Sequence, residues 1–356
     1  MRPKSFKQSQ RDYERWLTAQ LDEIWMPDLR RKHEKMQRSA FIFLRATYWR
    51  WAEEILATCP DLAGAPTVVA VGDIHLENYG VWRDDDGRLV WGVNDFDEAA
   101  DMPYALDVVR LATSAVLACA KARGDRKAMC STILDGYREG VANPRPFILD
   151  EHHPWLRTRF VVSEEERARF WEKMAGLQKD ERISKKYRNP LQHQMPGTDA
   201  AIEKFARRTA GTGSLGRPRW VAVADWRGGR LVREAKALVT SAWTLAHPGA
   251  RKRSGALITA GRYRAPDPWY WVQDDVVVRR LSPNARKIEV RDRPGGLCDA
   301  AMLRAMGHEL ANIHLGTGDV SRAIHEDLAR RRNDWLNRAT EKAAEFVTND
   351  FNEWCR

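Results

Sequence analysis

The sequence is poor in cysteine, and its cysteines follow no regular spacing. The five are Cys59, Cys119, Cys130, Cys298 and Cys355, and none belongs to a CxxC pair. This pattern argues against a zinc ribbon and against a disulfide framework. We therefore expect reduced thiols that are mostly buried.

Long apolar runs are also missing. The most apolar stretch, residues 105–120, is interrupted by Asp107 and Arg110. It therefore falls short of the ~20 apolar residues that a membrane span needs. Residues 1–16 lack the apolar core of a secretory signal. We expect a cytoplasmic protein that does not contact a membrane.

Charge of one sign is in excess. The chain has 356 residues, with 59 Lys and Arg against 49 Asp and Glu, and a formal net charge of +10. That excess suits an anionic small molecule, nucleic acid or an anionic membrane surface. The basic residues are spread along the chain without a long basic tail, so a solvated basic surface explains the charge equally well.

The hydrophobic periodicity predicts an α+β protein in three parts. The parts are a mainly helical segment (1–205), a strand-rich segment (206–290) and a helical tail (291–356). Short strands are predicted at 67–71, 79–83, 89–93, 219–224 and 230–234, and tail helices at 299–315 and 320–347. At about 150 residues per domain, this length fits two domains or two lobes.

The first motif whose side chains could take part in a reaction is Gly72-Asp73-Ile-His75-Leu-Glu-Asn78, which follows the first buried strand. An Asp five residues before an Asn in such a loop is typical of phosphoryl transfer. Asp73 would accept the proton of an attacking hydroxyl, and the Asn78 oxygen would help to hold Mg²⁺. His75 would orient the loop. The alternative is a polar turn whose side chains satisfy backbone groups.

The second motif is Asn94-Asp95-Phe96-Asp97-Glu98, at the end of the following hairpin. The hairpin would bring Asp95 beside Asn78. Magnesium prefers oxygen ligands, usually one or two carboxylates together with phosphates, so Asp95 and Asp97 are candidate ligands. A solvated acidic loop is the alternative.

The third motif is the glycine loop Gly211-x-Gly213-Ser214-x-Gly216, which precedes a strand and not a helix. This context argues against a dinucleotide fold and favours the kinase arrangement, in which a hairpin covers the phosphates. Arg233 and Glu234 lie on the returning strand, with Lys236 just beyond. A basic residue there would reach the phosphates. An ordinary glycine turn is the alternative.

The sequence carries no motif for several other reaction classes. GxxxxGK[ST], HExxH and GxSxG are all absent from the sequence, which excludes a P-loop, a zincin protease and a nucleophile elbow as these motifs define them.

Taken together, these residues resemble a bacterial family named domain of unknown function 2252, which is grouped with the protein-kinase-like and aminoglycoside-phosphotransferase-like fold. The resemblance rests on these strings: Lys35-Met36-x-x-Ser39-x-Phe41-x-Phe43-Leu-Arg45, the Gly72–Gly80 and Asn94–Glu98 motifs, Asp107-x-x-Arg110-Leu-Ala-x-Ser114, Gly211–Gly216, Val232-Arg-Glu-Ala235 and Gly307-x-x-Leu310-Ala-x-x-His314. The family usually has Lys where this chain has Arg233.

The resemblance implies a two-lobed kinase-like fold that uses ATP and Mg²⁺. It implies that Asp73 is the catalytic base, that Asn78 and Asp95 hold Mg²⁺, and that Asp107 braces the catalytic loop. The catalytic loop precedes the glycine loop here, the reverse of the usual order, so we expect a circularly permuted fold. Permutation is tolerated when the original termini lie close together.

The sequence therefore predicts a phosphotransferase that acts on a small-molecule acceptor, and the net charge suits an anionic acceptor better than a cationic one. A nucleotide-binding pseudoenzyme or an AMP-transferring enzyme is the second hypothesis, motivated by Arg233. A nucleic-acid-binding protein ranks third, because it leaves Asp73, Asn78 and Asp95 unexplained. No motif identifies the acceptor or an oligomeric state.

Overall fold

The computed structural model describes residues 4–119, 125–290 and 296–356, and these form a mixed α+β protein. The helices are α1 (Phe6–Gln20), α2 (Met26–Met36), α3 (Ala40–Ala46), α4 (Tyr48–Thr58), α5 (Tyr104–Cys119), α6 (Arg126–Ala142), α7 (Pro154–Arg157), α8 (Glu164–Ala175), α9 (Lys185–His193), α10 (Ala242–Ala246), α11 (Gly255–Thr259), α12 (Ala300–Leu315), α13 (Ser321–Arg330) and α14 (Trp335–Cys355). The strands are β1 (Thr67–Ala70), β2 (Tyr79–Arg83), β3 (Leu89–Val93), β4 (Ala100–Pro103), β5 (Phe147–Ile148), β6 (Ala201–Arg207), β7 (Arg219–Trp226), β8 (Gly229–Ala237), β9 (Trp271–Gln273) and β10 (Val276–Leu281).

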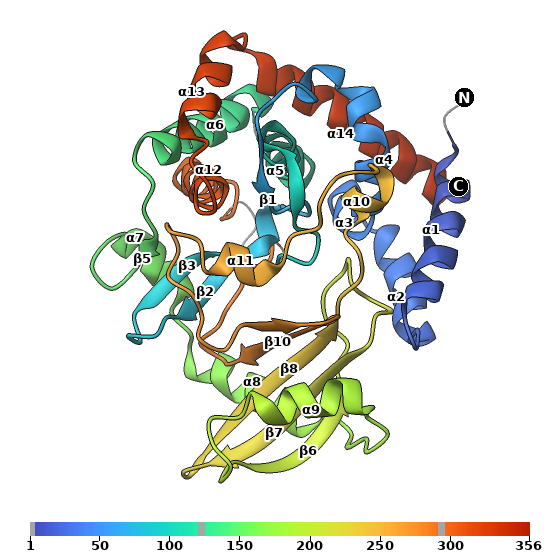
Figure 1. Cartoon of the computed structure of the whole chain (residues 1–356), viewed down its shortest axis with the longest axis vertical. Coiled ribbons are helices and arrows are strands. Elements are labelled where there is room, and N and C mark those ends of the chain that lie inside the picture. The colour runs from blue at the N-terminus through green and yellow to red at the C-terminus, as the bar shows by residue number, and fades with distance from the viewer. Residues whose placement is uncertain (1–3, 120–124, 291–295) are drawn as a thin grey trace.

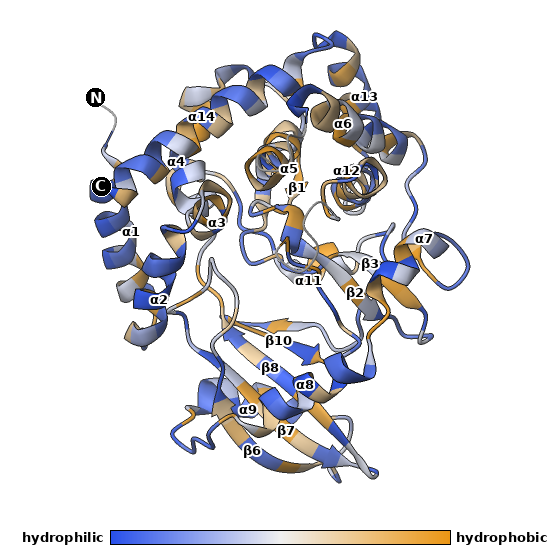
Figure 2. Cartoon of the chain, turned by 180° about the vertical axis from the view of Figure 1, so that it is seen from behind, coloured by the Kyte–Doolittle hydropathy of each residue, from blue (hydrophilic) through white to orange (hydrophobic). Residues whose placement is uncertain are grey.

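Helix α5 forms the centre of the helical part (Figure 1). It packs against α3, α6, α12 and α14, and nearly all of its residues from Tyr104 to Ala115 are buried. A helix that is apolar on all sides belongs in the interior. Figure 2 shows this contrast, because α5 and α12 are largely hydrophobic whereas α1 and α2 carry polar outer faces. Among the described residues, no helix combines the length and the apolar character needed to cross a bilayer.

Helices α6 and α12 approach each other closely because glycines lie at their contact. A Cβ added at Gly140 would lie 2.6 Å from the carbonyl oxygen of His308, and one at Gly307 would collide with the carbonyl of Ile133. The contact holds α12 at a fixed depth beside α5. His314 at the end of α12 is thereby positioned for its contact with the site described below.

The strands around the first two motifs form where the sequence predicts them. Strands β2 and β3 pair antiparallel, from Tyr79 opposite Val93 to Arg83 opposite Leu89. Gly87 has φ +76° in the connecting turn, a conformation that glycine adopts without strain. Strand β1 pairs with β4. Asp73 follows the end of β1, and the second motif lies between β3 and β4.

The larger sheet has the strand order β6-β7-β8-β10-β9, and every pair is antiparallel. It begins at Ala201, before the predicted boundary at 206. Strand β6 was missed because a β-bulge between Ile202 and Lys204 interrupts its alternation. Helix α8 packs Met174 onto this sheet and α9 contacts β7, β8 and β10. The sheet and its covering helices therefore extend earlier in the chain than the predicted strand-rich part.

Two further expectations differ from the structure. The helix predicted at 320–347 is divided into α13 and α14, because Arg331 is extended (φ −72°, ψ 147°). Its guanidinium binds Asp327 at 2.6 Å and lies over the Trp335 ring. The expectation of reduced thiols is wrong for one pair, since Cys119 and Cys298 form a disulfide. Cys59 and Cys130 are buried thiols, as predicted.

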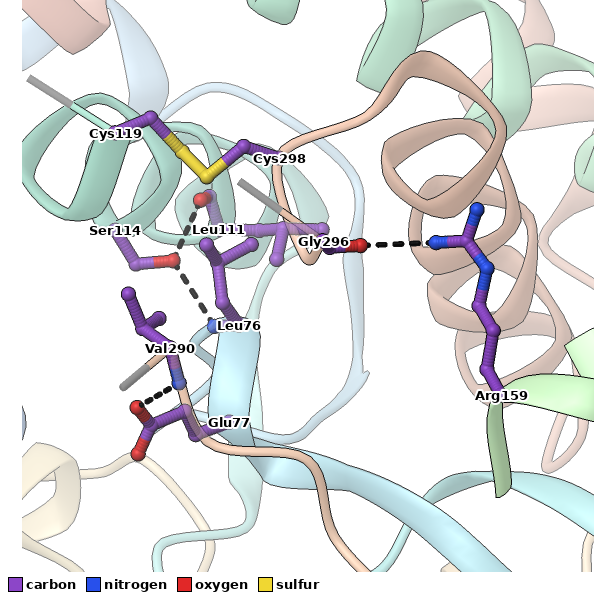
Figure 3. Close-up of a disulfide and its surroundings, with 9 residues drawn as sticks. All are labelled: Leu76, Glu77, Leu111, Ser114, Cys119, Arg159, Val290, Gly296 and Cys298. Carbon is purple, nitrogen blue, oxygen red and sulfur yellow. Dashed lines mark hydrogen bonds between the residues drawn. A yellow bond between two sulfur atoms is a disulfide. The ribbon is translucent and has the colours of Figure 1, made fainter. Parts of the chain in front are cut away.

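The disulfide joins the end of α5 to the segment that precedes α12 (Figure 3). The two Cα atoms lie 6.2 Å apart although the residues are separated by 179 positions. Spacing along the chain does not reveal such a pair. Cytosolic proteins seldom keep structural disulfides. The Cys119–Cys298 bond therefore does not support the expected cytoplasmic location, which stays a prediction.

Candidate functional site

A cavity of about 560 Å³ lies between the five-stranded sheet and the helical part. Its wall includes α2, the loop after β1, the loop after β3, the glycine loop and β10. The three motifs therefore meet in one cavity, although 140 residues separate Asp73 from Gly213. A cavity of this size can enclose a nucleotide-sized ligand.

The loop after β1 is held by α5. Asp107 accepts hydrogen bonds from the backbone N–H of Val71 at 2.7 Å and of Gly72 at 3.0 Å. Its carboxylate also lies 3.2 Å from His314 Nε2. One turn further along the loop, the N–H of Leu76 donates to Ser114 Oγ at 3.2 Å (Figure 3). Asp107 therefore braces the loop that carries Asp73, as predicted.

Asp73 faces the cavity from this braced loop. One carboxylate oxygen accepts a hydrogen bond from Arg110 at 2.5 Å. Arg110 is itself fully buried and its guanidinium lies over the rings of Tyr48 and Trp51. Burial raises the pKa of Asp73, and Arg110 opposes this shift while the charge on Asp95 adds to it. A carboxylate with a raised pKa and one fixed oxygen can accept a proton.

Asn78 connects the two acidic loops. Its side-chain amide donates to the backbone carbonyl of Asp73 at 3.3 Å and to that of Asp95 at 3.1 Å. Its Oδ1 is buried and has no hydrogen-bond partner among the described residues. A buried carbonyl oxygen without a donor costs free energy, so this atom calls for a cation or a donor from a bound ligand.

Asp95 and Asp97 share one lysine. Lys236 Nζ lies 2.5 Å from Asp97 and 3.4 Å from Asp95. Burial alone would raise the pKa of Asp95, but the charges of Lys236, Lys287 and Arg279 hold this pKa well below its usual range. Burial and the neighbouring Asp95 raise the pKa of Asp97. Asp95 is thus the carboxylate of the pair that is more readily ionised.

The glycine loop approaches the loop that carries Asp73 closely. Gly211 and Gly216 have φ +77° and +93°, which turns the chain between β6 and β7. A Cβ added at Gly213 would lie 2.9 Å from the Arg45 carbonyl and 3.5 Å from Asp73 Oδ2. Lys32 Nζ donates to the Gly213 carbonyl at 3.1 Å, and Arg219 donates to Ser214 Oγ at 2.7 Å.

The expectation for Arg233 differs from the structure. Its guanidinium donates to the Gln194 carbonyl and lies 4.1 Å from the Trp269 ring centre, and it does not line the cavity. Side chains alternate between the faces of a strand, so Arg233 points away from the face that bears Lys236. Lys236 is the basic side chain of β8 that reaches the acidic loop. Arg233, the residue that motivated the pseudoenzyme hypothesis, thus lies outside the cavity wall, and that hypothesis stays a prediction.

Glu234 acts below the cavity wall. It is fully buried and pairs with Arg208, Arg219 and Arg279, all three of which line the cavity. Burial opposes its ionisation, but these three charges hold the pKa of Glu234 well below its usual range. Glu234 therefore positions arginines and does not face a ligand.

His75 lines the cavity and accepts a hydrogen bond from the Glu77 N–H. Burial and the charge of Arg45 keep the pKa of His75 well below its usual range. A neutral His75 orients the loop.

Residues 27–146 match the family described as "Uncharacterized protein conserved in bacteria (DUF2252)". The match covers the first two motifs and Asp107 but ends before the glycine loop. Comparison with curated proteins and with solved structures finds no significant match.

No group of three His, Cys, Asp or Glu side chains is arranged around a metal ion in the described ranges, so a metal would have fewer protein ligands. Asn78 Oδ1 lacks a donor, and the Asn78 amide binds the backbone of Asp95, whose carboxylate is ionised. Magnesium typically takes one or two protein carboxylates and completes its shell with phosphate oxygens and water. This donor set fits Mg²⁺ that arrives with a phosphate ligand.

Several cavity residues were not predicted as site residues. Around the wall, Lys and Arg side chains are about twice as numerous as Asp and Glu. Lys32 is buried there and Lys287 is partly buried. Burial and Arg217 lower the pKa of Lys32 to about 8, and burial and Arg279 lower that of Lys287 to about 8. Among the basic residues near the site, only Lys236 carried a sequence signal, its position beyond the glycine hairpin. Lys236 is not part of the wall but pairs with Asp95 and Asp97, which are.

Proposed function

We propose that this protein is an ATP- and Mg²⁺-dependent phosphotransferase with a two-lobed kinase-like fold. One observation carries the proposal: the glycine loop covers the loop that bears Asp73, with a Gly213 Cβ position 3.5 Å from the Asp73 carboxylate. Asn78 joins that loop to Asp95. Phosphoryl transfer needs mainly positioning and charge neutralisation, and this cavity supplies both.

Asp73 would accept the proton of the acceptor hydroxyl as its oxygen bonds to the γ-phosphorus, and ADP would leave. Arg110 holds one oxygen of Asp73, so the other is directed at the cavity. Asn78 Oδ1 and Asp95 would hold Mg²⁺, which would supply positive charge against the phosphates. Asp97 is paired with Lys236 and would act through that lysine.

The phosphates would lie under the glycine loop. In kinases a glycine-rich loop precedes a lysine on the third strand of the sheet. Here the loop lies between β6 and β7, and Lys236 lies on β8, the third strand. Arg208, Arg219 and Arg279, which Glu234 holds, add positive charge on the same side. The arrangement supports binding of a polyphosphate.

A circular permutation would account for the order of these parts. The catalytic loop comes first in the chain and the glycine loop later. The backbone N–H groups of Phe6 and Lys7 donate to Glu353 at 3.1 Å and 3.2 Å, so the N-terminal helix contacts the C-terminal one. Neighbouring ends are the condition under which permutation is tolerated.

Calorimetric titration of ATP, with and without Mg²⁺, tests the proposal. We expect binding in the micromolar range, about −8 kcal/mol, that requires Mg²⁺ and is lost in Asp95→Asn. The matched control is Asp101→Asn, which removes an acid that pairs with Arg253 and does not line the cavity. Absence of ATP binding by the unmodified protein would overturn the proposal. Labelled ATP would then distinguish phosphate transfer from AMP transfer in the product.

A further inference from the structure

We propose that the acceptor is a phosphomonoester, held by its phosphate on a basic face of α2. This α2 basic face consists of Arg31, Lys35 and Arg38, and all three side chains line the cavity. The inference rests on the proposed phosphotransferase function and names the substrate class of the same site.

Two of the three residues share one helical face. Arg31 and Lys35 are four positions apart in α2, whereas Arg38 follows the end of the helix at Met36 and lines the same cavity. No ion pair joins any of them to an acidic side chain among the described residues. Crowding of like charges is unfavourable unless an anion compensates it. Burial lowers the pKa of Lys35, the charges of Arg31, Arg45 and Arg38 lower it further, and Glu289 opposes them.

The α2 basic face and Asp73 both lie within reach of the Arg45 charge. Arg45 acts by its charge on Lys35 and on Asp73, and all three residues line the cavity. It also pairs with Glu77 of the catalytic loop. The arginines that Glu234 holds come instead from β7, from β10 and from the residue after β6. The cavity wall therefore carries two basic groups from different elements, and the proposal assigns one to each phosphorylated substrate.

The fold fixes α2 at this position. Lys32, beside Arg31, donates to the Gly213 carbonyl and so ties α2 to the glycine loop. Ser39 caps α3 by accepting from the Ile42 N–H, and Met36, Phe41 and Phe43 are buried. The Lys35–Arg45 string thus combines a core turn with three cavity cations, Lys35, Arg38 and Arg45. The proposed phosphate subsite gives this string a function. The proposed catalytic residues lie outside the string and do not account for it.

A dianionic ligand is favoured over a carboxylate by the number of cations. Three guanidinium or ammonium groups without acidic partners exceed what one carboxylate neutralises, whereas a phosphate carries more than one negative charge and several acceptor oxygens. The acceptor would thus carry one phosphate on the α2 basic face and a free hydroxyl at Asp73.

Titration of inorganic pyrophosphate into protein saturated with AMP-PNP and Mg²⁺ tests the subsite, since the nucleotide then fills its own phosphate positions. We expect binding that weakens at least tenfold in R31A/K35A/R38A. The control R322A/R330A/R332A removes equal charge on and just after α13, outside the cavity, and should bind as the unmodified protein does. Thermal unfolding of both triple variants checks that they fold.

The outcomes separate this inference from the proposed function. Equal pyrophosphate binding by both triple variants would overturn the α2 subsite. Loss of AMP-PNP affinity in R31A/K35A/R38A would also overturn it, because the face would then serve the nucleotide. Failure of AMP-PNP to bind the unmodified protein would reject the phosphotransferase function, and pyrophosphate would then be titrated alone. Transfer to glycerol 3-phosphate but not to glycerol or glycerate would give direct support.

Discussion

The side chain of Asn78 donates to the backbone carbonyl of Asp95 at 3.1 Å, 17 residues further along the chain. The same amide donates to the carbonyl of Asp73. One side chain therefore sets the distance between the proposed base and the proposed metal ligand. Both donors of the amide are used for this purpose, which leaves only its oxygen for a ligand.

Replacement of Asn78 by Ala should weaken Mg²⁺-dependent ATP binding at least tenfold, about 1.4 kcal/mol. It should also lower the free energy of unfolding by about 1–3 kcal/mol, because two buried carbonyls lose their donors. Calorimetry and urea denaturation measure the two effects. The exposed Asn333→Ala serves as the control, and an unchanged ATP affinity in Asn78→Ala would contradict the assigned role.

Lys236→Met should weaken nucleotide binding at least tenfold, whereas Arg233→Met should leave it unchanged. Lys236 pairs with both acids of the second motif, and Arg233 lies on the opposite face of the strand. Fluorescence titration with a labelled nucleotide compares the variants at equal folded fraction. If Arg233→Met were the weaker binder, the orientation of β8 described here would be incorrect.

Gly213→Ala should reduce phosphoryl transfer by at least tenfold. The added methyl group would meet the Arg45 carbonyl at 2.9 Å and would displace the loop from Asp73. Gly64→Ala is the matched control, because a Cβ there meets nothing within 4 Å. Steady-state turnover of both variants gives the comparison, and equal rates would show that the close approach has no catalytic importance.

Affinity for ATP and Mg²⁺ should fall as the pH rises from 7 to 9. Lys32 and Lys287, each with a pKa of about 8, lose their charge over this range, and an anion binds the charged forms. Lys287→Met should bind more weakly at pH 7 and show a shallower decrease. The same two pKa values make the free energy of unfolding rise with pH above about 8, because the unfolded lysines, with ordinary pKa values, bind more protons there. A pH-independent affinity would exclude these lysines from the binding site.

Removal of the disulfide should lower the free energy of unfolding by about 2–4 kcal/mol. Cys298→Ser, or reduction by a dithiol, opens the link between α5 and the segment before α12. Cys355→Ser, at an exposed free thiol, should have no effect. Denaturant unfolding with and without reductant measures the difference. Five titratable thiols in the native protein would contradict the disulfide.

Local patterns were sufficient for the elements around the site. Strands β2 and β3 have the predicted bounds, since a turn sequence separates two apolar runs and pairing follows from it. Asp107 braces the loop that carries Asp73, a role that the family resemblance and not a local pattern implied. Strand β6 was missed because its bulge removes the period of two on which strand prediction depends.

The basic residues of the site were harder to predict. Arg233 and Lys236 are three positions apart, so they lie on opposite faces of one strand, and only the packing of β8 decides which face meets the cavity. The α2 basic face and the Cys119–Cys298 disulfide depend on contacts between distant segments. No local signal marks either of them.

The sequence by itself determined the motifs and their order: an Asp73 loop that ends at Asn78, an acidic loop after the next hairpin, and a glycine loop before a strand. These features depend on residue types and on the spacing of apolar residues along the chain, which the sequence has whether or not it is folded. The tertiary structure alone decided that the three meet in one cavity, that Lys236 and not Arg233 faces Asp95, and that the wall is basic. The physical reason is that burial, pairing and charge crowding arise only between segments that packing brings together.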